Sequence, residues 1–109
     1  MSTIHTLGSG TATATAGAAT LNNRFGIITT EALTTAQNAI YTLTITNSAV
    51  SATDLAFASV ANGTNTQGTP MIVRVTPAAG SLVITVKNAH DSAQALNGTL
   101  KIAYAVFGK

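Results

Sequence analysis

Cysteine and tryptophan are absent from this 109-residue sequence, and charged residues make up only 7% of it, against about 25% in an average globular protein. Without cysteine the chain has no disulfide and no thiolate metal site, and its redox compartment stays undetermined. Hydrophobic residues make up 46% of the sequence, which argues against disorder of the acidic or basic kind. A chain of this length is expected to form one domain.

The scarcity of charge has two interpretations, because mixed surface charges normally keep a small domain dispersed in water. In the first, a surface rich in threonine and asparagine is solvated without charged side chains. In the second, neighbouring subunits cover much of the outer surface. The second is favoured, since the core-forming strands described below also carry apolar residues on their outer faces.

The net charge of +2 does not come from a basic patch. Phosphate backbones are bound by clustered cations, so we expect no nucleic-acid partner. No apolar run approaches the roughly 20 residues that span a bilayer, and the N-terminal MSTIHTLGSG lacks the pattern of a secretory signal. The basic residues are scattered along the chain: Arg24, Arg74, Lys87, Lys101 and Lys109.

Residues 70–88, PMIVRVTPAAGSLVITVKN, show the clearest structural pattern. Apolar residues recur at every second position on both sides of a short loop, which is the period of a half-buried β-strand. Pro77 and Gly80 supply the turn chemistry between the two runs. The stretch is therefore predicted to be a β-hairpin with five loop residues, one apolar inner face and one mixed outer face.

Further strands are predicted at residues 21–30, 40–46, 55–60 and 99–107, with no convincing long helix. Short strands at such spacing are typical of an all-β sandwich, including jelly-roll arrangements, or of a barrel. We expect a single jelly-roll-like β-sandwich domain over residues 21–109. The expected core consists of apolar residues that share one face of each strand: Phe25, Ile27, Tyr41, Leu43, Ile45, Leu55, Phe57, Met71, Val73, Val75, Leu82, Ile84, Val86, Leu100, Ile102, Tyr104 and Val106.

The first 20 residues, MSTIHTLGSGTATATAGAAT, are interrupted by glycines and alternate threonine with alanine, which offers little to bury. This segment is predicted to be an extended N-terminal arm. It is either loose, or ordered against another subunit by backbone hydrogen bonds along a sheet edge.

Residues able to carry chemistry are few. His90-Asp91-Ser92 are adjacent in sequence, whereas the members of a catalytic triad converge from separate elements, so a solvated turn is expected there. His5 and His90 are the only imidazoles, and the three acidic residues lie far apart, which makes zinc and calcium sites unexpected. We expect no enzyme, no metal, no cofactor and no small-molecule substrate.

The outer faces of the core-forming strands are more informative than the polar residues. Scattered surface hydrophobes are normal, but a continuous patch would mark a contact surface. Two apolar residues of the arm could add to such a patch. The candidate subunit-interface residues are Ile4, Leu7, Ile72, Arg74, Val83 and Phe107.

Three stretches carry a resemblance to a known group of proteins: residues 27–48 (IITTEALTTAQNAIYTLTITNS), 69–88 (TPMIVRVTPAAGSLVITVKN) and 95–107 (ALNGTLKIAYAVF). In these strand patterns and turns the chain resembles small virion structural proteins of tailed bacteriophages. Proteins of this kind look like β-sandwich capsid decoration, or cement, proteins, which are often trimers. The family has no catalytic residues to carry over.

The resemblance implies a structural virion protein that stabilises a capsid by binding neighbouring capsid subunits. Its partner would be the major capsid protein, and the chain would form a homo-oligomer such as a trimer. It would be made in the cytoplasm of the host bacterium and end on the capsid surface.

Two alternatives remain beside this interpretation. One is a phage tail or fibre component, or a receptor- or carbohydrate-binding module, which would show exposed aromatic residues at a loop end because sugar faces stack on them. The other is an enzyme, which would need a pocket with convergent polar groups.

Overall fold

The regular elements of residues 9–108, the part of the chain that the computed structural model describes, are all β-strands. They are β1 (Ser9–Thr13), β2 (Ala18–Thr20), β3 (Phe25–Thr29), β4 (Ile40–Thr46), β5 (Leu55–Asn62), β6 (Pro70–Ala78), β7 (Ser81–Asn88) and β8 (Leu100–Phe107).

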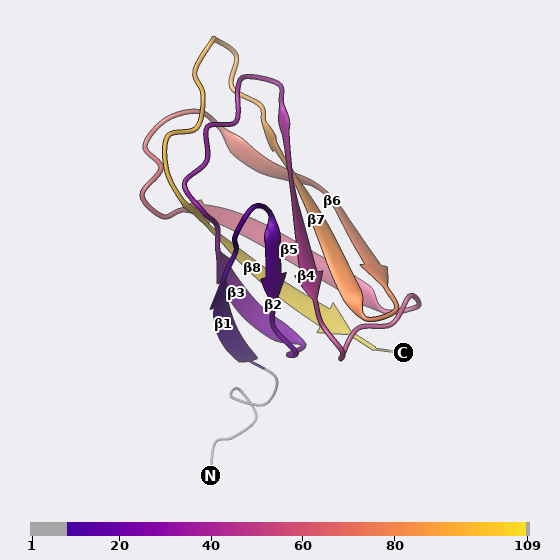
Figure 1. Ribbon diagram of the computed structural model, residues 1–109. Coiled ribbons are helices and arrows are strands. Elements are labelled where there is room, and N and C mark those ends of the chain that lie inside the picture. The colour runs from indigo at the N-terminus through magenta and orange to yellow at the C-terminus, as the bar shows by residue number, and fades with distance from the viewer. Residues whose placement is uncertain (1–8, 109) are drawn as a thin grey trace.

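The strands form two four-stranded sheets that pack face to face (Figure 1). One has the order β1-β3-β8-β5 and the other the order β2-β4-β7-β6. Within each sheet the first pair is parallel, β1 with β3 and β2 with β4, and the other pairs are antiparallel. The prediction of an all-β fold with two packed sheets is confirmed.

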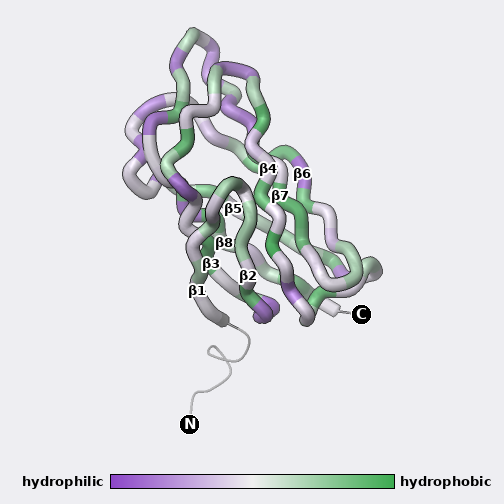
Figure 2. The backbone as a smooth tube through the Cα atoms, in the orientation of Figure 1, coloured by the Kyte–Doolittle hydropathy of each residue, from purple (hydrophilic) through white to green (hydrophobic). Residues whose placement is uncertain are grey.

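The core lies between the sheets, where strands β4, β7 and β8 contribute alternate apolar residues. Figure 2 shows hydrophobic residues along these strands and hydrophilic ones concentrated in loops. Alternation places every second side chain on the same face, so one face of each strand is buried and the other is not. The inward residues of these three strands agree with the prediction: Leu43, Ile45, Leu82, Ile84, Val86, Leu100, Ile102, Tyr104 and Val106.

In strands β3 and β5 the predicted inward and outward faces are reversed. Phe25 and Ile27 are exposed, whereas Ile28, the residue after Ile27, is fully buried. Likewise β5 turns Leu55 and Phe57 outward and packs Ala56, Ala58 and Val60 against the core. Both faces of these strands carry apolar residues, so alternation defines two faces without deciding which is buried. The prediction that these four large residues are core residues was wrong.

Strand β6 changes face part-way along its length. Its pairing with β7 shifts register between Ile72 and Arg74, which is a β-bulge that adds one residue on β6. Ile72 and Val75 therefore pack against the core, while Met71 and Val73 are exposed, contrary to prediction. A bulge of this kind interrupts the period of two that the prediction assumed.

The predicted hairpin is present as β6 and β7, but its turn is shorter than expected. The paired strands continue to Ala78 and Ser81, which leaves only Ala79 and Gly80 between them. Gly80 has a φ of 82°, a left-handed conformation that glycine adopts without steric cost.

Residues 9–20 do not form an arm, because they supply β1 and β2 to the two sheets. The prediction of an arm over residues 1–20 fails for this part, and residues 1–8 lie outside the described residues. Backbone pairing holds these strands in place despite their small side chains, and Ala14 and Ala19 are buried in the core.

The turn between β1 and β2 is fixed by a carboxylate. Glu31 accepts a hydrogen bond from the Gly17 amide at 2.9 Å and another from the Tyr41 hydroxyl at 3.0 Å. Burial, the hydrogen bond to Glu31 and the charge of Glu31 together raise the pKa of Tyr41 above its usual value. The tyrosine therefore remains a hydrogen-bond donor at neutral pH.

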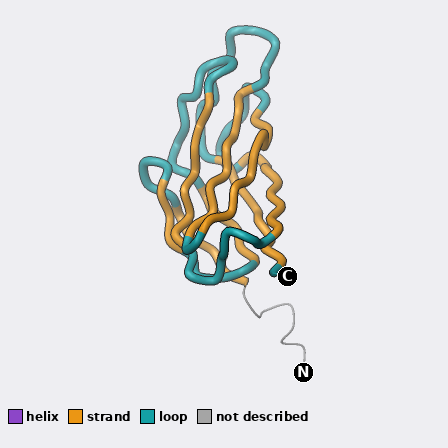
Figure 3. The backbone as a smooth tube through the Cα atoms, turned by 90° about the vertical axis from the view of Figure 1, so that its right-hand side faces the viewer, coloured by secondary structure: helices purple, strands orange, loops and turns teal. Residues whose placement is uncertain are grey.

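Long loops extend beyond the strands at the end of the sandwich opposite to the end of β8 (Figure 3). The side chain of Asn88, which is fully buried, joins these loops. Its amide nitrogen donates to the carbonyl oxygens of Thr35 (3.0 Å) and Gln94 (2.8 Å), and its oxygen accepts from the amides of Thr69 (3.0 Å) and His90 (3.2 Å). All the hydrogen-bonding capacity of this amide is used.

Candidate interaction surface

The outer side of the sheet β1-β3-β8-β5 carries large apolar residues from three neighbouring strands. Each of its five large side chains is between 38% and 58% exposed. We call this surface the apolar face, and its members are Phe25 and Ile27 on β3, Leu55 and Phe57 on β5, and Ala103, Ala105 and Phe107 on β8.

Strand register brings these residues together. On the central strand, Ala105 pairs with Phe25 of β3 on one side and with Phe57 of β5 on the other. Ala103 in turn pairs with Ile27 on β3. The small alanines therefore form a floor along β8, and the larger residues of β3 and β5 rise on either side of it.

Between β5 and β8 this face has a shallow, open hollow of about 240 Å³, lined by Phe57, Ala58, Ser59, Ala103, Tyr104 and Ala105. Phe107 lies beside it and makes edge-to-face contacts with two other rings. Its ring centroid is 5.8 Å from that of Phe25 and 5.8 Å from that of Phe57. Such aromatic pairs are favourable, so the apolar face has a defined shape.

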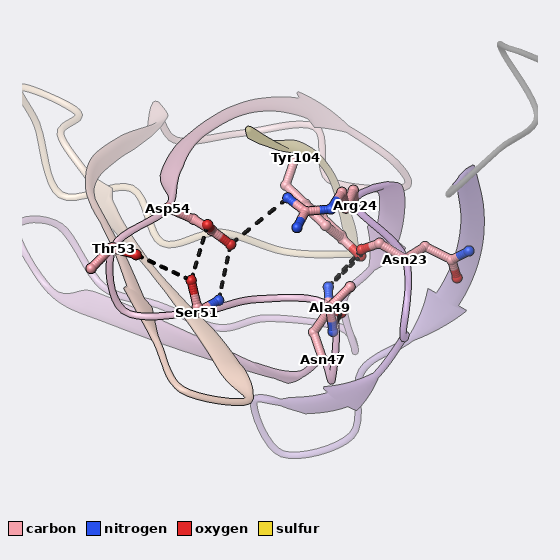
Figure 4. Close-up of polar contacts among 8 residues, drawn as sticks. All are labelled: Asn23, Arg24, Asn47, Ala49, Ser51, Thr53, Asp54 and Tyr104. Atoms are coloured by element: carbon pink, nitrogen blue, oxygen red, sulfur yellow. Dashed lines mark hydrogen bonds and ion pairs between the residues drawn. The ribbon is translucent and has the colours of Figure 1, made fainter. Parts of the chain in front are cut away.

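Charged groups lie at the ends of the apolar face. Arg24, just before β3, and Asp54, just before β5, approach to 3.8 Å between Nη1 and Oδ2 (Figure 4). Asp54 also accepts hydrogen bonds from the amide (2.9 Å) and hydroxyl (3.0 Å) of Ser51. Lys101 is exposed near the other end of β8. An apolar centre with polar groups at its edge is the usual anatomy of a protein interface.

Beneath this edge, a buried polar cluster holds the loops that carry Arg24 and Asp54. The Tyr104 hydroxyl donates to the Asn23 carbonyl oxygen at 2.9 Å, and the Asn47 amide nitrogen donates to the same oxygen at 2.6 Å. Burial raises the pKa of Tyr104 to about 12, so its hydroxyl stays neutral and donating at physiological pH. Figure 4 shows these side chains converging.

The outer side of the other sheet has a different chemistry. It presents threonine side chains from β4, β6 and β7, with the charged Arg74 and Lys87 among them. Three exposed hydrophobic residues, Ile40, Met71 and Val73, lie on the same side, and Lys87 pairs with both Ile40 and Met71. Hydroxyl and charged groups of this kind are well solvated. The threonine residues of this surface, which we call the threonine face, are Thr42, Thr44, Thr46, Thr76 and Thr85.

The structure does not bring the predicted interface residues together. Phe107 belongs to the apolar face, whereas Arg74 and Val83 lie on the threonine face of the opposite sheet. Ile72 points inward and packs against the core, because it pairs with the buried Val86 ahead of the bulge in β6. The remaining two predicted residues, Ile4 and Leu7, lie outside the described part of the chain.

Sequence reasoning missed most of the apolar face, because Phe25, Ile27, Leu55 and Phe57 were assigned to the core. A signal was present in the complementary patterns of two strands that turn out to be neighbours. In β5 the large residues alternate with alanines, and in β8 a second set of large residues also alternates with alanines. Only the pairing shows that β5 turns its large residues outward and β8 its large residues inward.

The stretch His90-Asp91-Ser92 lies in the loops that Asn88 joins, outside the apolar face. His90 Nδ1 is 2.9 Å from the Thr69 hydroxyl, and His90 Nε2 is 4.0 Å from Asp91, whose side chain is almost fully exposed. Among residues 9–108, no three histidine, aspartate or glutamate side chains lie close enough together to hold a metal ion.

Within the same residues, no helix has the length and hydrophobicity needed to cross a membrane. Comparison with known proteins assigns the chain to no group: no protein family, no curated protein and no solved structure matches it.

Proposed function

We propose that this chain is a structural virion protein that decorates a bacteriophage capsid and stabilises it by binding neighbouring capsid subunits. The sequence resemblance suggests the virion and the capsid partner, and the apolar face supports the homo-oligomeric state that this role includes. Three phenylalanines and two aliphatic residues share this face without any charged side chain between them. Contiguous apolar surface of this kind marks protein-protein contacts.

Such a protein acts through binding free energy. A domain that attaches to assembled capsid subunits and not to separated ones shifts the equilibrium toward the assembled shell. Contacts of low charge suit this task, since they lose little from desolvation of charged groups. The proposal includes a homo-oligomeric state and a location on the capsid surface.

The fold proposed with this function is jelly-roll-like. The antiparallel pairs β3 with β8 and β4 with β7 are nested, one inside the other, around the β6–β7 hairpin, and β5 pairs with the other side of β8. Nested pairing across two sheets supports a chain wound as a jelly roll.

One observation bears on the alternative of a carbohydrate-binding module, because Phe25, Phe57 and Phe107 are exposed after all. Sugar sites combine an aromatic platform with nearby polar groups that fix orientation. Here the rings meet edge to face, and the floor between them consists of alanines. The arrangement therefore favours a protein surface over a sugar.

The test is to locate the protein on intact virions of the bacteriophage that encodes it, using a gold-labelled antibody and electron microscopy. Label distributed over the heads is expected. Label confined to tails would replace the capsid role with the tail or fibre alternative, and unlabelled virions would overturn both. Bare heads incubated with purified protein should then regain the label.

A further inference from the structure

We infer that the apolar face is the contact surface between two copies of this chain, which pack sheet against sheet about a two-fold axis. This goes beyond the capsid role and does not depend on it, since it concerns how the chain covers its own exposed surface. The area, the shape and the charge distribution of the face all indicate that its partner is a second copy of the chain.

The area of the face matches one side of a stable dimer. A phenylalanine side chain offers about 150–250 Å² and a leucine or isoleucine somewhat less, so the exposed fractions amount to roughly 400–500 Å² of apolar surface. A standard interface buries about 800 Å² per partner, of which about 56–65% is apolar. The apolar face would therefore supply the apolar part of such an interface by itself.

The shape of the face is suited to a copy of itself. A two-fold interface uses the same patch on both partners, so projecting groups and hollows must occur on one surface. This face has both: the rings of Phe57 and Phe107 project, and Ala103 and Ala105 form the floor of the hollow beside them. Sheets that pack face to face lie about 10 Å apart, which leaves room for rings of one copy above the alanines of the other.

The distribution of charge selects this face over the threonine face. Two copies would approach without placing a charged group in the centre of the contact, because Arg24, Asp54 and Lys101 lie at its ends. On the threonine face, Arg74 and Lys87 would instead be brought against like charges or buried. A free chain with a net charge of +2 also has little surface charge to keep an uncovered apolar patch in solution.

The experiment is sedimentation equilibrium of the full chain from about 1 to 100 µM, with Ala105→Arg as the disruptive variant. Ala105 is on the outer side of β8, so an arginine there adds a charge to the hollow without entering the core. We expect twice the chain mass for the native protein and a dissociation constant raised by roughly 100-fold or more in the variant, since an unpaired charge would be buried.

Two further variants keep the outcome decisive. Thr44→Arg places the same charge on the threonine face and should leave the dimer unchanged. Ser59→Arg, at the edge of the same hollow, replaces Ala105→Arg should that variant lose its native circular dichroism spectrum.

A native chain that stays monomeric at 100 µM, one that sediments at three times the chain mass, or a folded Ala105→Arg variant that still dimerises would overturn the inference. The result is separable from the capsid role. A monomer that labels phage heads would refute the inference and the homo-oligomeric state proposed with the capsid role, but not the capsid binding. A dimer absent from virions would refute the capsid role alone.

Discussion

The ring of Phe107 packs edge to face against the ring of Phe57, with an interplanar angle of 68° and a centroid separation of 5.8 Å. The two residues come from neighbouring strands, and both rings lie on the outside of the sandwich. Phe25 contacts Phe107 from the other side in the same manner. Three exposed rings thus fix one another's orientation, and the apolar face is shaped before any partner binds.

The reversed face of β3 can be tested with two adjacent residues. Ile28 is fully buried and Ile27 is 43% exposed, so an aspartate at position 28 would place an unpaired charge in the core. In the Ala105→Arg background, where no second copy covers the apolar face, we expect Ile28→Asp to cost more than about 4 kcal/mol of unfolding free energy and Ile27→Asp less than about 1 kcal/mol. Urea denaturation measures both, and a larger loss for Ile27→Asp would mean that β3 has the opposite face inward.

Asn88 is expected to stabilise the loop end of the sandwich through its four hydrogen bonds. Asn88→Ala would leave two backbone carbonyls and two amides without their partner in a buried site, at a cost of about 3 kcal/mol. The matched control is Asn97→Ala, because Asn97 is exposed and bonds only to Thr66 through its side chain. Its expected cost is about 1 kcal/mol or less. Equal losses in thermal or urea unfolding would argue against this role for Asn88.

Stability should fall in alkali because of Tyr104. Its pKa is about 12 in the folded protein, against about 10 when unfolded. Between these values the unfolded state has lost the proton that the folded state keeps, so unfolding becomes more favourable as pH rises. The contribution is complete below pH 10, is lost between about pH 10 and 12, and is on the order of 2 kcal/mol.

The measurement is the urea midpoint of the native chain and of Tyr104→Phe from pH 8 to 12. The variant lacks the ionisable hydroxyl but loses the hydrogen bond to Asn23. It should therefore be less stable at pH 8 and should show a smaller decline toward pH 12. Parallel pH profiles would contradict the assignment.

Gly17 and Gly80 offer a matched pair of left-handed glycines, with φ of 77° and 82°. An added Cβ at Gly17 would lie 2.6 Å from the Thr42 carbonyl oxygen, whereas at Gly80 it would meet nothing within 4 Å. Gly80→Ala should cost only the conformational strain of about 1 kcal/mol, and Gly17→Ala should cost more. Chemical denaturation of both variants decides this, and a greater loss at Gly80 would be the contrary result.

Some elements were predictable because a single strand carries the necessary information. In β7, apolar Leu82, Ile84 and Val86 are opposed by a face that includes Thr85 and Lys87. Only one of those faces is suited to a core, so both the strand and its orientation follow from the residues. The all-β class follows similarly, from several such runs separated by turn residues.

The sequence by itself therefore determined the β class, the two-sheet arrangement and the inward faces of strands with one apolar side. The tertiary structure decided the rest. It placed residues 9–20 in the sheets through backbone pairing, which side-chain patterns do not record, and it turned Leu55 and Phe57 outward. Alternation defines two faces of a strand, but the neighbouring strands and the opposite sheet decide which one is buried. In β5, Ala56 and Ala58 pack toward the core, and Leu55 and Phe57 are left to form part of the apolar face.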